Sequence, residues 1–373
     1  MPPLSVLIKP ASSACNMNCD YCFYRDVANH RTEGFRGMIS SRILEQAVSS
    51  LMEYAEGSIH FLFQGGEPTL AGLDFYRQTT ALQKKYGRSN LAVYNSLQTN
   101  GYIIDEEWAR FLSSHHFLVG LSLDGTQPLH DAHRRCRQGE GTFQRVAKAA
   151  RLFDTFGTEY NILSVLTDHN TPAIDEIYSF FKSQGFHWLQ FIPCLPPLDV
   201  PALASDLCLS SDYYAKFLIR IFDLWLEDIK RGQYISIRHL DNWLSILLGS
   251  GPASCGMMGR CSIQLVIESD GSVYPCDFYV LDEWKLGNIM TDYVSDMIRS
   301  QRASDFIKLS VALPEQCRCC SFYPLCRNGC RRERLPGTEQ EPGINRYCSA
   351  YKEFFSTRGK LLQWAATLLA QRR

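Results

Sequence analysis

The chain of 373 residues lacks the features that mark several large classes of protein. Its 38 Lys and Arg residues against 39 Asp and Glu residues leave a net charge of −1, which provides no basic surface for nucleic acid or an anionic membrane. No apolar run approaches the roughly 20 residues that span a bilayer. Residues 1–5 lack the basic stretch followed by an apolar one that begins a secretory signal. We therefore expect a cytoplasmic protein with no nucleic-acid or membrane partner.

Cysteine, in contrast, is abundant, with 15 residues in the chain. An odd number fits a complete disulfide framework poorly. In a reducing compartment, clustered thiols more often bind metal or carry out redox chemistry. Most of these cysteines fall into one group near the start of the chain and a second group in its last third, whereas the nine histidines show no ligand spacing. The sequence therefore indicates sites built on thiolates.

The first half of the chain alternates short β-rich runs with amphipathic helical stretches. The expected strands are Ser5–Lys9, Ile59–Phe63, Leu91–Leu97, Phe117–Leu123, Tyr160–Leu166 and Trp188–Ile192. The expected helices between them are Ser41–Ala55, Leu73–Lys85, Glu106–Ser114, Phe143–Phe156 and Ala173–Ser183. Strands separated by helices predict right-handed crossovers and a parallel sheet. We expect the α/β class: a partial (β/α)6 barrel followed by a C-terminal Cys-rich domain, with sites at the carboxyl ends of the strands.

After residue 193 the pattern changes to helices, expected over 212–231, 240–248 and 347–370, and to a cysteine-rich region. That region contains an expected hairpin, in which the runs 263–269 and 272–275 flank Asp270-Gly271, a pair suited to a tight turn. The expected domains are a barrel over 1–200, a helical connector over 201–254, an auxiliary cluster domain over 255–348 and a C-terminal helix over 349–373.

The first cysteine group, Cys15, Cys19 and Cys22, places three thiols in eight residues just after the first expected strand. Thiolate ligands select zinc or an iron–sulfur cluster. Structural zinc normally takes four ligands, and His30 is the only histidine nearby. Three cysteines would leave one iron of a [4Fe–4S] cluster open to a small molecule. A structural zinc knuckle is the alternative.

The Cys-x3-Cys-x2-Cys spacing, with Tyr21 before the last cysteine, resembles the radical S-adenosylmethionine (SAM) enzymes. Further matches follow successive strand ends, beginning with a Gly-Gly-Glu segment after the second strand. The resemblance implies a [4Fe–4S] cluster on Cys15, Cys19 and Cys22, with S-adenosyl-L-methionine bound at its open iron. The cofactor contacts that it implies are Tyr21, Gly66, Glu67, Ser122, Asp124, Arg134 and Leu195.

The second cysteine group offers eight thiols, enough for two fully ligated [4Fe–4S] clusters. Its spacing resembles the auxiliary-cluster (SPASM-type) domain of radical SAM enzymes that modify peptides and proteins. The resemblance implies one cluster on Cys255, Cys261, Cys276 and Cys330, and another on Cys317, Cys320, Cys326 and Cys348. Two structural zinc sites are the alternative. Cys319 is left without a role, and the isolated Cys136, Cys194 and Cys208 are expected to be small apolar residues.

Over nearly the whole chain the similarity is to the anaerobic sulfatase-maturating enzymes. It is carried by the segments Lys9–Ser13, Phe63–Leu73, Tyr94–Gly101 and Asp270–Tyr279. The resemblance implies oxidation of a Cys or Ser in a Cys/Ser-x-Pro-x-Arg motif to Cα-formylglycine, with an unfolded sulfatase as substrate. It also implies a low-potential electron donor such as flavodoxin or ferredoxin. Asp277, directly after Cys276, resembles the proton acceptor of that family.

Two other functions fit parts of the pattern. A different radical SAM peptide maturase, such as one that forms thioether links, would carry the same cysteine motifs, and the segment around Asp277 is the main discriminator. An electron carrier or a zinc protein without catalysis would not cleave S-adenosylmethionine. Tyr24, Gln64 and Asn100 lie beside the strand-end loops, and we expect them to contact the peptide substrate.

Overall fold

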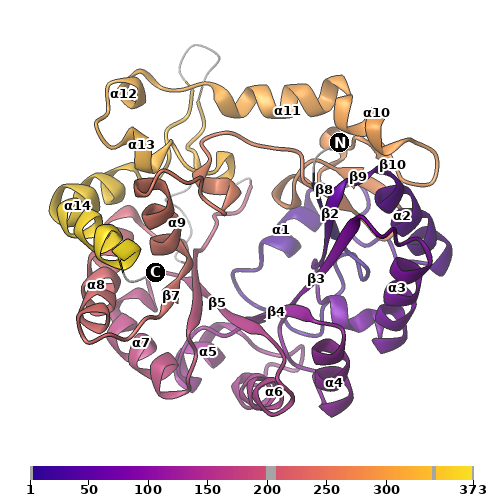
Figure 1. Ribbon diagram of the computed structural model, residues 1–373, viewed down its shortest axis with the longest axis horizontal. Coiled ribbons are helices and arrows are strands. Elements are labelled where there is room, and N and C mark those ends of the chain that lie inside the picture. Colours follow the sequence, from indigo (N-terminus) through magenta and orange to yellow (C-terminus); the bar gives the residue numbers. More distant parts are fainter. Residues whose placement is uncertain (1–2, 199–206, 338–341, 372–373) are drawn as a thin grey trace. The chain divides into compact units, whose positions relative to one another are not determined.

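The computed structural model describes residues 3–198, 207–337 and 342–371 (Figure 1). The chain divides into two compact units, which are interleaved along the sequence. Unit 1 comprises residues 1–123, 130–161 and 263–306, and unit 2 comprises residues 124–129, 162–262 and 307–373. The expected domain boundary at residues 200 and 201 lies outside the described residues. Each unit combines several segments of the chain, so the units do not test where the four expected domains begin and end. Those four domains stay a prediction.

The sheet of unit 1 is built on four parallel strands in chain order. They are β1 (Leu4–Ile8), β2 (Gly57–Phe63), β3 (Leu91–Thr99) and β4 (Phe117–Ser122). The register pairs Ile8 with Phe63 and Phe63 with Leu97. The loops that follow β1, β2 and β3 therefore leave the sheet at the same edge, which is where the first cysteine group and the Gly-Gly-Glu segment lie.

The expected hairpin is confirmed as β8 (Leu265–Ile267) and β9 (Ser272–Tyr274), each shorter than the sequence indicated. Gly271 has φ 82°, which the turn requires and which glycine adopts without steric cost. Sequence analysis did not predict that β8 pairs in parallel with β1, or that the two-residue β10 (Gly287–Asn288) pairs with β9. The hairpin of the cysteine-rich region thus extends the sheet of unit 1.

The strands of unit 2 are also parallel: β5 (Tyr160–Leu166) pairs with β6 (Trp188–Pro193), and β6 pairs with β7 (Ser236–Ile237). All six expected strands are therefore present. β7 was not expected, because two residues carry no readable alternation. The α/β class, with parallel strands followed by a cysteine-rich region, is confirmed.

The helices match the expected amphipathic stretches closely. In α2 the buried residues are Leu44, Ala47, Val48, Leu51 and Met52, a helical spacing that forms one apolar face. The α-helices up to residue 183 are α1 (Phe23–Asn29), α2 (Ser41–Tyr54), α3 (Leu73–Lys85), α4 (Glu106–Ser114), α5 (Gln127–His133), α6 (Phe143–Phe156) and α7 (Ile174–Ser183). Helix α2 packs against α3 in unit 1 (Figure 1).

The remaining helices hold the C-terminal part of the chain together. They are α8 (Ser211–Lys230), α9 (Arg238–Leu247), α10 (Val294–Arg299), α11 (Gln301–Val311), α12 (Glu315–Arg318), α13 (Tyr323–Cys326) and α14 (Cys348–Gln371). In unit 2, α14 packs along α8 (Figure 1). The Trp243 ring stacks on Phe354 with 4.9 Å between centroids, and Arg358 pairs with Asp223 at 2.7 Å. Within the described residues, no helix has both the length and the apolar character needed to cross a bilayer.

Candidate cofactor and substrate sites

The first cysteine group lies between β1 and α1, and Cys22 is the residue that precedes α1. The Cys22 N–H donates to the Cys19 carbonyl at 3.3 Å, and the Met17 N–H donates to Cys15 Sγ at 3.4 Å. Burial, followed by the negative charge of Glu67, raises the pKa of the Cys15 thiol to about 12. Cys19 and Cys22 act in the same direction. A half-buried group of thiols that repel one another as thiolates favours a metal centre in place of the protons, which fits an iron–sulfur cluster.

Glu67 joins the loop after β2 to the loop after β3. Its buried carboxylate accepts hydrogen bonds from Thr69 N and Oγ1, Thr99 Oγ1 and Asn100 N, at 2.7 to 3.1 Å. Burial raises the pKa of the Glu67 carboxyl group, and these hydrogen bonds oppose that rise. The Glu67 N–H donates to the Ala14 carbonyl at 2.7 Å. The side chain thus organises the two loops, while the backbone lies against the first cysteine group.

Glycine is required on both sides of this contact. Gly65 has φ 88° and Gly66 has φ 48°. A Cβ at Gly66 would collide with the Ala14 carbonyl oxygen, and one at Gly65 would collide with the side chain of Lys9. The turn therefore packs directly on the cysteine loop, as a segment that offers its backbone to a ligand must.

Tyr21 and Arg134, both expected near the cofactor, lie together. Arg134 is buried, and its guanidinium lies 5.4 Å from the centroid of the Tyr21 ring. The cysteine loop is attached to the segment after α5, because the Asn18 N–H donates to the Arg135 carbonyl at 2.8 Å. At the end of β4, the Ser122 hydroxyl accepts a hydrogen bond from Gln98 Nε2 at 3.1 Å. With Gly66 and Glu67, unit 1 thus brings five of the seven expected cofactor residues beside the cysteine loop or onto a strand end.

Asp124 and Leu195, the other two expected contacts, belong to unit 2. Asp124 is buried, and its Oδ1 accepts a hydrogen bond from the Val165 N–H at 2.9 Å. Leu195 follows β6 and is half-buried. The geometry of unit 2 therefore gives Asp124 a clear local role in holding β5, beside any role toward a cofactor.

Asn100, expected to contact peptide, reaches the cysteine loop. Its Nδ2 donates to Asn16 Oδ1 at 2.8 Å and lies 3.7 Å from Cys15 Sγ. Its side-chain oxygen accepts a hydrogen bond from Tyr102 N at 2.9 Å. Both ends of the amide are thus occupied by the loops around the cysteine group.

Asp277 is buried and pairs with the half-buried Tyr24. The Tyr24 hydroxyl donates to Asp277 Oδ2 at 2.5 Å, and Asp277 is 7% exposed. Burial and, to a smaller extent, the negative charge of Glu268 raise the pKa of the Asp277 carboxyl group, while the positive charge of Lys9 and the Tyr24 hydrogen bond lower it. Burial and Asp277 keep the pKa of Tyr24 well above its usual value, against a hydrogen bond with Gln64, so Tyr24 remains a donor. Asp277 Oδ1 has no hydrogen-bond partner among the described residues, so this oxygen can accept a proton.

Four cysteines of the second group line one pocket in unit 2. These are Cys317 of α12, Cys320, Cys326 of α13 and Cys348 of α14. Burial raises the pKa of Cys326 to about 12, and the other three thiols add to that rise. Four thiols around one pocket match the ligand set of a [4Fe–4S] cluster. Cys319 is exposed, points to within 3.9 Å of the Glu315 carboxylate, and is not among the residues that line the pocket.

Three cysteines of the other expected set also belong to unit 2, namely Cys255, Cys261 and Cys330. A Cβ at Gly256 would lie 3.4 Å from Cys330 Cβ, and burial, followed by the charge of Cys261, raises the pKa of Cys255. Cys276, the fourth expected member, belongs to unit 1. The isolated cysteines Cys136, Cys194 and Cys208 are all buried.

Comparison with known proteins gives two family models and a set of full-length relatives. Residues 10–181 match the radical SAM superfamily, and residues 255–321 match the SPASM iron–sulfur cluster-binding domain. A cysteine-type anaerobic sulfatase-maturating enzyme of Clostridium novyi is 45% identical over 372 residues, covering 100% of both chains. The chain belongs to the anaerobic sulfatase-maturating enzymes. A serine-type member from Bacteroides thetaiotaomicron is 33% identical over 95% of this chain and 89% of its own.

A solved structure of another anaerobic sulfatase-maturating enzyme, native anSMEcpe with bound AdoMet and Cp18Cys peptide, has the same fold. It superimposes with a TM-score of 0.93 at 46% identity, over 98% of this chain and 99% of that one. The expected family, the α/β fold and the radical SAM class of enzyme are thereby confirmed. The cofactor types expected from the sequence, S-adenosylmethionine and iron–sulfur clusters, are those of the two matched families.

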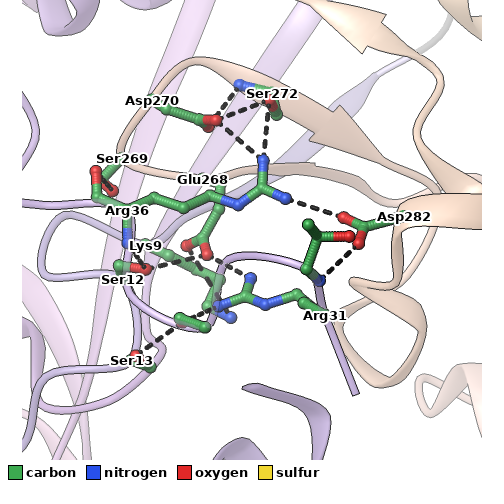
Figure 2. Close-up of polar contacts among 12 residues, drawn as sticks. Lys9, Ser12, Ser13, Arg31, Arg36, Glu268, Ser269, Asp270, Ser272 and Asp282 are labelled. Carbon is green, nitrogen blue, oxygen red and sulfur yellow. Dashed lines mark hydrogen bonds and ion pairs between the residues drawn. The ribbon is translucent and has the colours of Figure 1, made fainter. Parts of the chain in front are cut away.

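Sequence analysis of this sulfatase-maturating enzyme missed a buried polar network in unit 1 (Figure 2). Glu268, at the end of β8, accepts hydrogen bonds from Ser12 and Arg31 and lies 3.9 Å from Lys9 Nζ. Next to it, Arg36 pairs with Asp270 and Asp282. The available signal was a charged residue directly after the apolar run Leu265–Ile267.

Proposed function

We propose that this enzyme oxidises the cysteine of a Cys-x-Pro-x-Arg motif in a sulfatase to Cα-formylglycine (3-oxoalanine), which activates the sulfatase under anaerobic conditions. The observation that carries the proposal is the hydrogen bond from Tyr24 to the buried Asp277, the residue directly after Cys276. Cysteine rather than serine is proposed as the preferred residue, because the cysteine-type relative is 45% identical and the serine-type relative 33%.

The metal sites of this proposal follow the cysteine groups. Cys15, Cys19 and Cys22 would hold the [4Fe–4S] cluster that binds S-adenosylmethionine. Two auxiliary [4Fe–4S] clusters would be held by the sets Cys255, Cys261, Cys276, Cys330 and Cys317, Cys320, Cys326, Cys348. The four thiols that line one pocket, and the mutual repulsion of the first three as thiolates, support the assignment.

The S-adenosylmethionine contacts would be Tyr21, Gly66, Glu67, Ser122, Asp124, Arg134 and Leu195. The Gly66–Glu67 backbone, packed on the cysteine loop, supports a site for the amino group of the cofactor. Arg134, buried over the Tyr21 ring, is suited to its carboxylate. A cluster and cofactor held there would supply, on reduction, the 5′-deoxyadenosyl radical needed to remove a hydrogen atom from the β-carbon of the substrate.

Asp277 accepts the proton that the substrate radical must then lose. Tyr24 holds one carboxylate oxygen and leaves Oδ1 available for that proton. The auxiliary cluster that Cys276, next to Asp277 in the chain, would help to ligate would supply an acceptor for the remaining electron. Loss of one hydrogen atom, one proton and one electron converts the cysteine side chain to a thioaldehyde, which water hydrolyses to the aldehyde and hydrogen sulfide.

An unfolded sulfatase would be the protein substrate, since the motif must enter a buried site. A low-potential donor such as flavodoxin or ferredoxin would supply the reducing electron, and the cytoplasm would be the compartment. The SAM-binding segment would extend over residues 1–200, and the auxiliary clusters would lie within residues 255–348.

The test is an anaerobic assay of the reconstituted, reduced enzyme with S-adenosylmethionine. A peptide containing Cys-x-Pro-x-Arg is offered beside its serine analogue, and mass spectrometry follows the aldehyde while 5′-deoxyadenosine is measured in parallel. We expect aldehyde from the cysteine peptide, its loss in Asp277→Asn, and its retention in Asp74→Asn, which changes a side chain 93% exposed. Formation of 5′-deoxyadenosine without aldehyde would show that this peptide is not the substrate. A thioether product would favour a radical SAM maturase that forms thioether links.

A further inference from the structure

Glu268 is the centre of a fully buried charged cluster in unit 1 (Figure 2). The side chains of Lys9, Arg31 and Glu268 are 2%, 1% and 0% exposed. Burying ion pairs costs solvation energy, and replacing them by apolar residues often leaves a protein equally stable or more so. Stability alone therefore does not account for three charged side chains at this place.

The two oxygens of Glu268 have different environments. Oε2 accepts hydrogen bonds from the Ser12 hydroxyl at 3.0 Å and from Arg31 Nη1. Oε1 lies 3.9 Å from Lys9 Nζ and has no hydrogen-bond partner among the described residues. Arg31 thus fixes and neutralises the carboxylate, while the oxygen that faces Lys9 makes only a loose ion pair.

The ammonium group of Lys9 lies between Glu268 and the catalytic pair. Its Nζ is 5.0 Å from the centroid of the Tyr24 ring, and its positive charge acts on Asp277. The stem of Lys9 runs along Gly65, where a Cβ would collide with it. Lys9 thus packs on the ring whose hydroxyl donates to Asp277 Oδ2.

We propose that Glu268, fixed by Arg31 and Ser12, is a positioning residue that holds the Lys9 ammonium beside the Tyr24–Asp277 pair. The proposal rests on the function proposed above. Without the negative charge of Glu268, two buried cations would repel each other and Lys9 would leave its place. The Tyr24 ring would then lose the cation that packs on it, and with it the position of the hydroxyl that holds Asp277 Oδ2, so transfer of the proton would fail after the hydrogen atom has been taken.

The decisive measurement is coupling, the amount of aldehyde formed per 5′-deoxyadenosine, in reconstituted enzyme. Glu268→Gln keeps the size of the side chain and removes its charge. We expect coupling to fall at least about tenfold, because kcat for aldehyde formation falls. Iron content should not change, nor should the Kd of the cysteine peptide for the unreduced enzyme measured by calorimetry. If the unaltered enzyme forms aldehyde and Glu268→Gln has the same coupling, this inference alone is overturned. If the unaltered enzyme forms no aldehyde, the proposed function itself is overturned.

A matched control and a double variant separate positioning from general damage. Asp282→Asn removes the partner of Arg36 and Thr32 N on the same side of the hairpin, without touching Glu268, and should keep full coupling. Lys9→Met should uncouple the enzyme as strongly as Glu268→Gln, and the double variant no further, because both act through one ammonium group. Additive losses, or equal uncoupling in Asp282→Asn, would contradict the proposal. If Glu268→Gln does not fold, Lys9→Met decides alone, and normal coupling there would overturn it.

Discussion

Tyr24 and Asp277 are 253 residues apart in the chain, and the Tyr24 hydroxyl donates to Asp277 Oδ2 at 2.5 Å. Tyr24 belongs to α1, which follows the first cysteine group, whereas Asp277 directly follows Cys276. The hydrogen bond thus connects the two cysteine-bearing segments of unit 1. It also fixes which carboxylate oxygen is occupied and which is left for a proton.

Removing this hydrogen bond should slow the proposed reaction without abolishing it. In Tyr24→Phe the ring stays and Asp277 loses its donor. A hydrogen bond to a charged group contributes about 1.5 to 3 kcal/mol, so we expect aldehyde formation to fall about 10- to 100-fold. The initial rate of aldehyde formation by mass spectrometry tests this. Tyr94→Phe, at an exposed tyrosine of the same unit, is the control and should have the normal rate. A normal rate in Tyr24→Phe would show that Asp277 does not need its donor.

The close contact between Gly66 and the cysteine loop predicts a specific loss of iron. In Gly66→Ala the new Cβ would collide with the Ala14 carbonyl and displace the loop that carries Cys15. We expect up to about four fewer iron atoms per chain after reconstitution, and loss of S-adenosylmethionine binding. Gly57→Ala is matched, because Gly57 also has positive φ (72°) but has no neighbour within 4 Å of the added Cβ. Equal iron loss in both variants would trace the effect to backbone strain, not to the contact.

The strands and helices could be predicted because their signals are local. Each amphipathic helix, such as α3 (Leu73–Lys85), has its apolar spacing and its boundary residues within one stretch of sequence. Pairing partners are not local. Nothing within Leu265–Ile267 indicates that this strand lies beside β1 rather than only beside β9.

The candidate site divides in the same way. The cysteine groups and Asp277 could be found from spacing and family resemblance, because their residue types are chemically distinctive. Glu268 and Arg31 could not, since a single Glu and a single Arg are usually solvated surface residues. Their importance appears only when folding buries both and places them beside Lys9.

Cys319 and Cys320 are adjacent in the chain and should behave differently. Cys320 lines the four-cysteine pocket, whereas Cys319 is exposed beside Glu315. Cys320→Ala should therefore lose about four iron atoms per chain, and Cys319→Ala should lose none. Iron and sulfide analysis with electron paramagnetic resonance of the reduced enzyme measures this. Iron loss in Cys319→Ala would show that Cys319, and not Cys320, is the cluster ligand.

His239 should make unit 2 sensitive to acid. Its ring packs against Trp243, with 4.5 Å between centroids, and burial lowers the pKa of His239 to about 4. Below pH 6.5 the His239 ring binds a proton in the unfolded chain, whereas in the folded chain it binds one only below about pH 4. The free energy of unfolding therefore falls as the pH falls through this range. The loss is about 2 kcal/mol at pH 5 relative to neutral pH. His239→Phe keeps an aromatic ring and removes the titration, so its thermal midpoint should drop less between pH 7.5 and pH 5 than that of the unaltered enzyme. The exposed His187, changed to Gln, is the control and should leave the drop as it was; a drop of the same size in His239→Phe would place the acid sensitivity elsewhere.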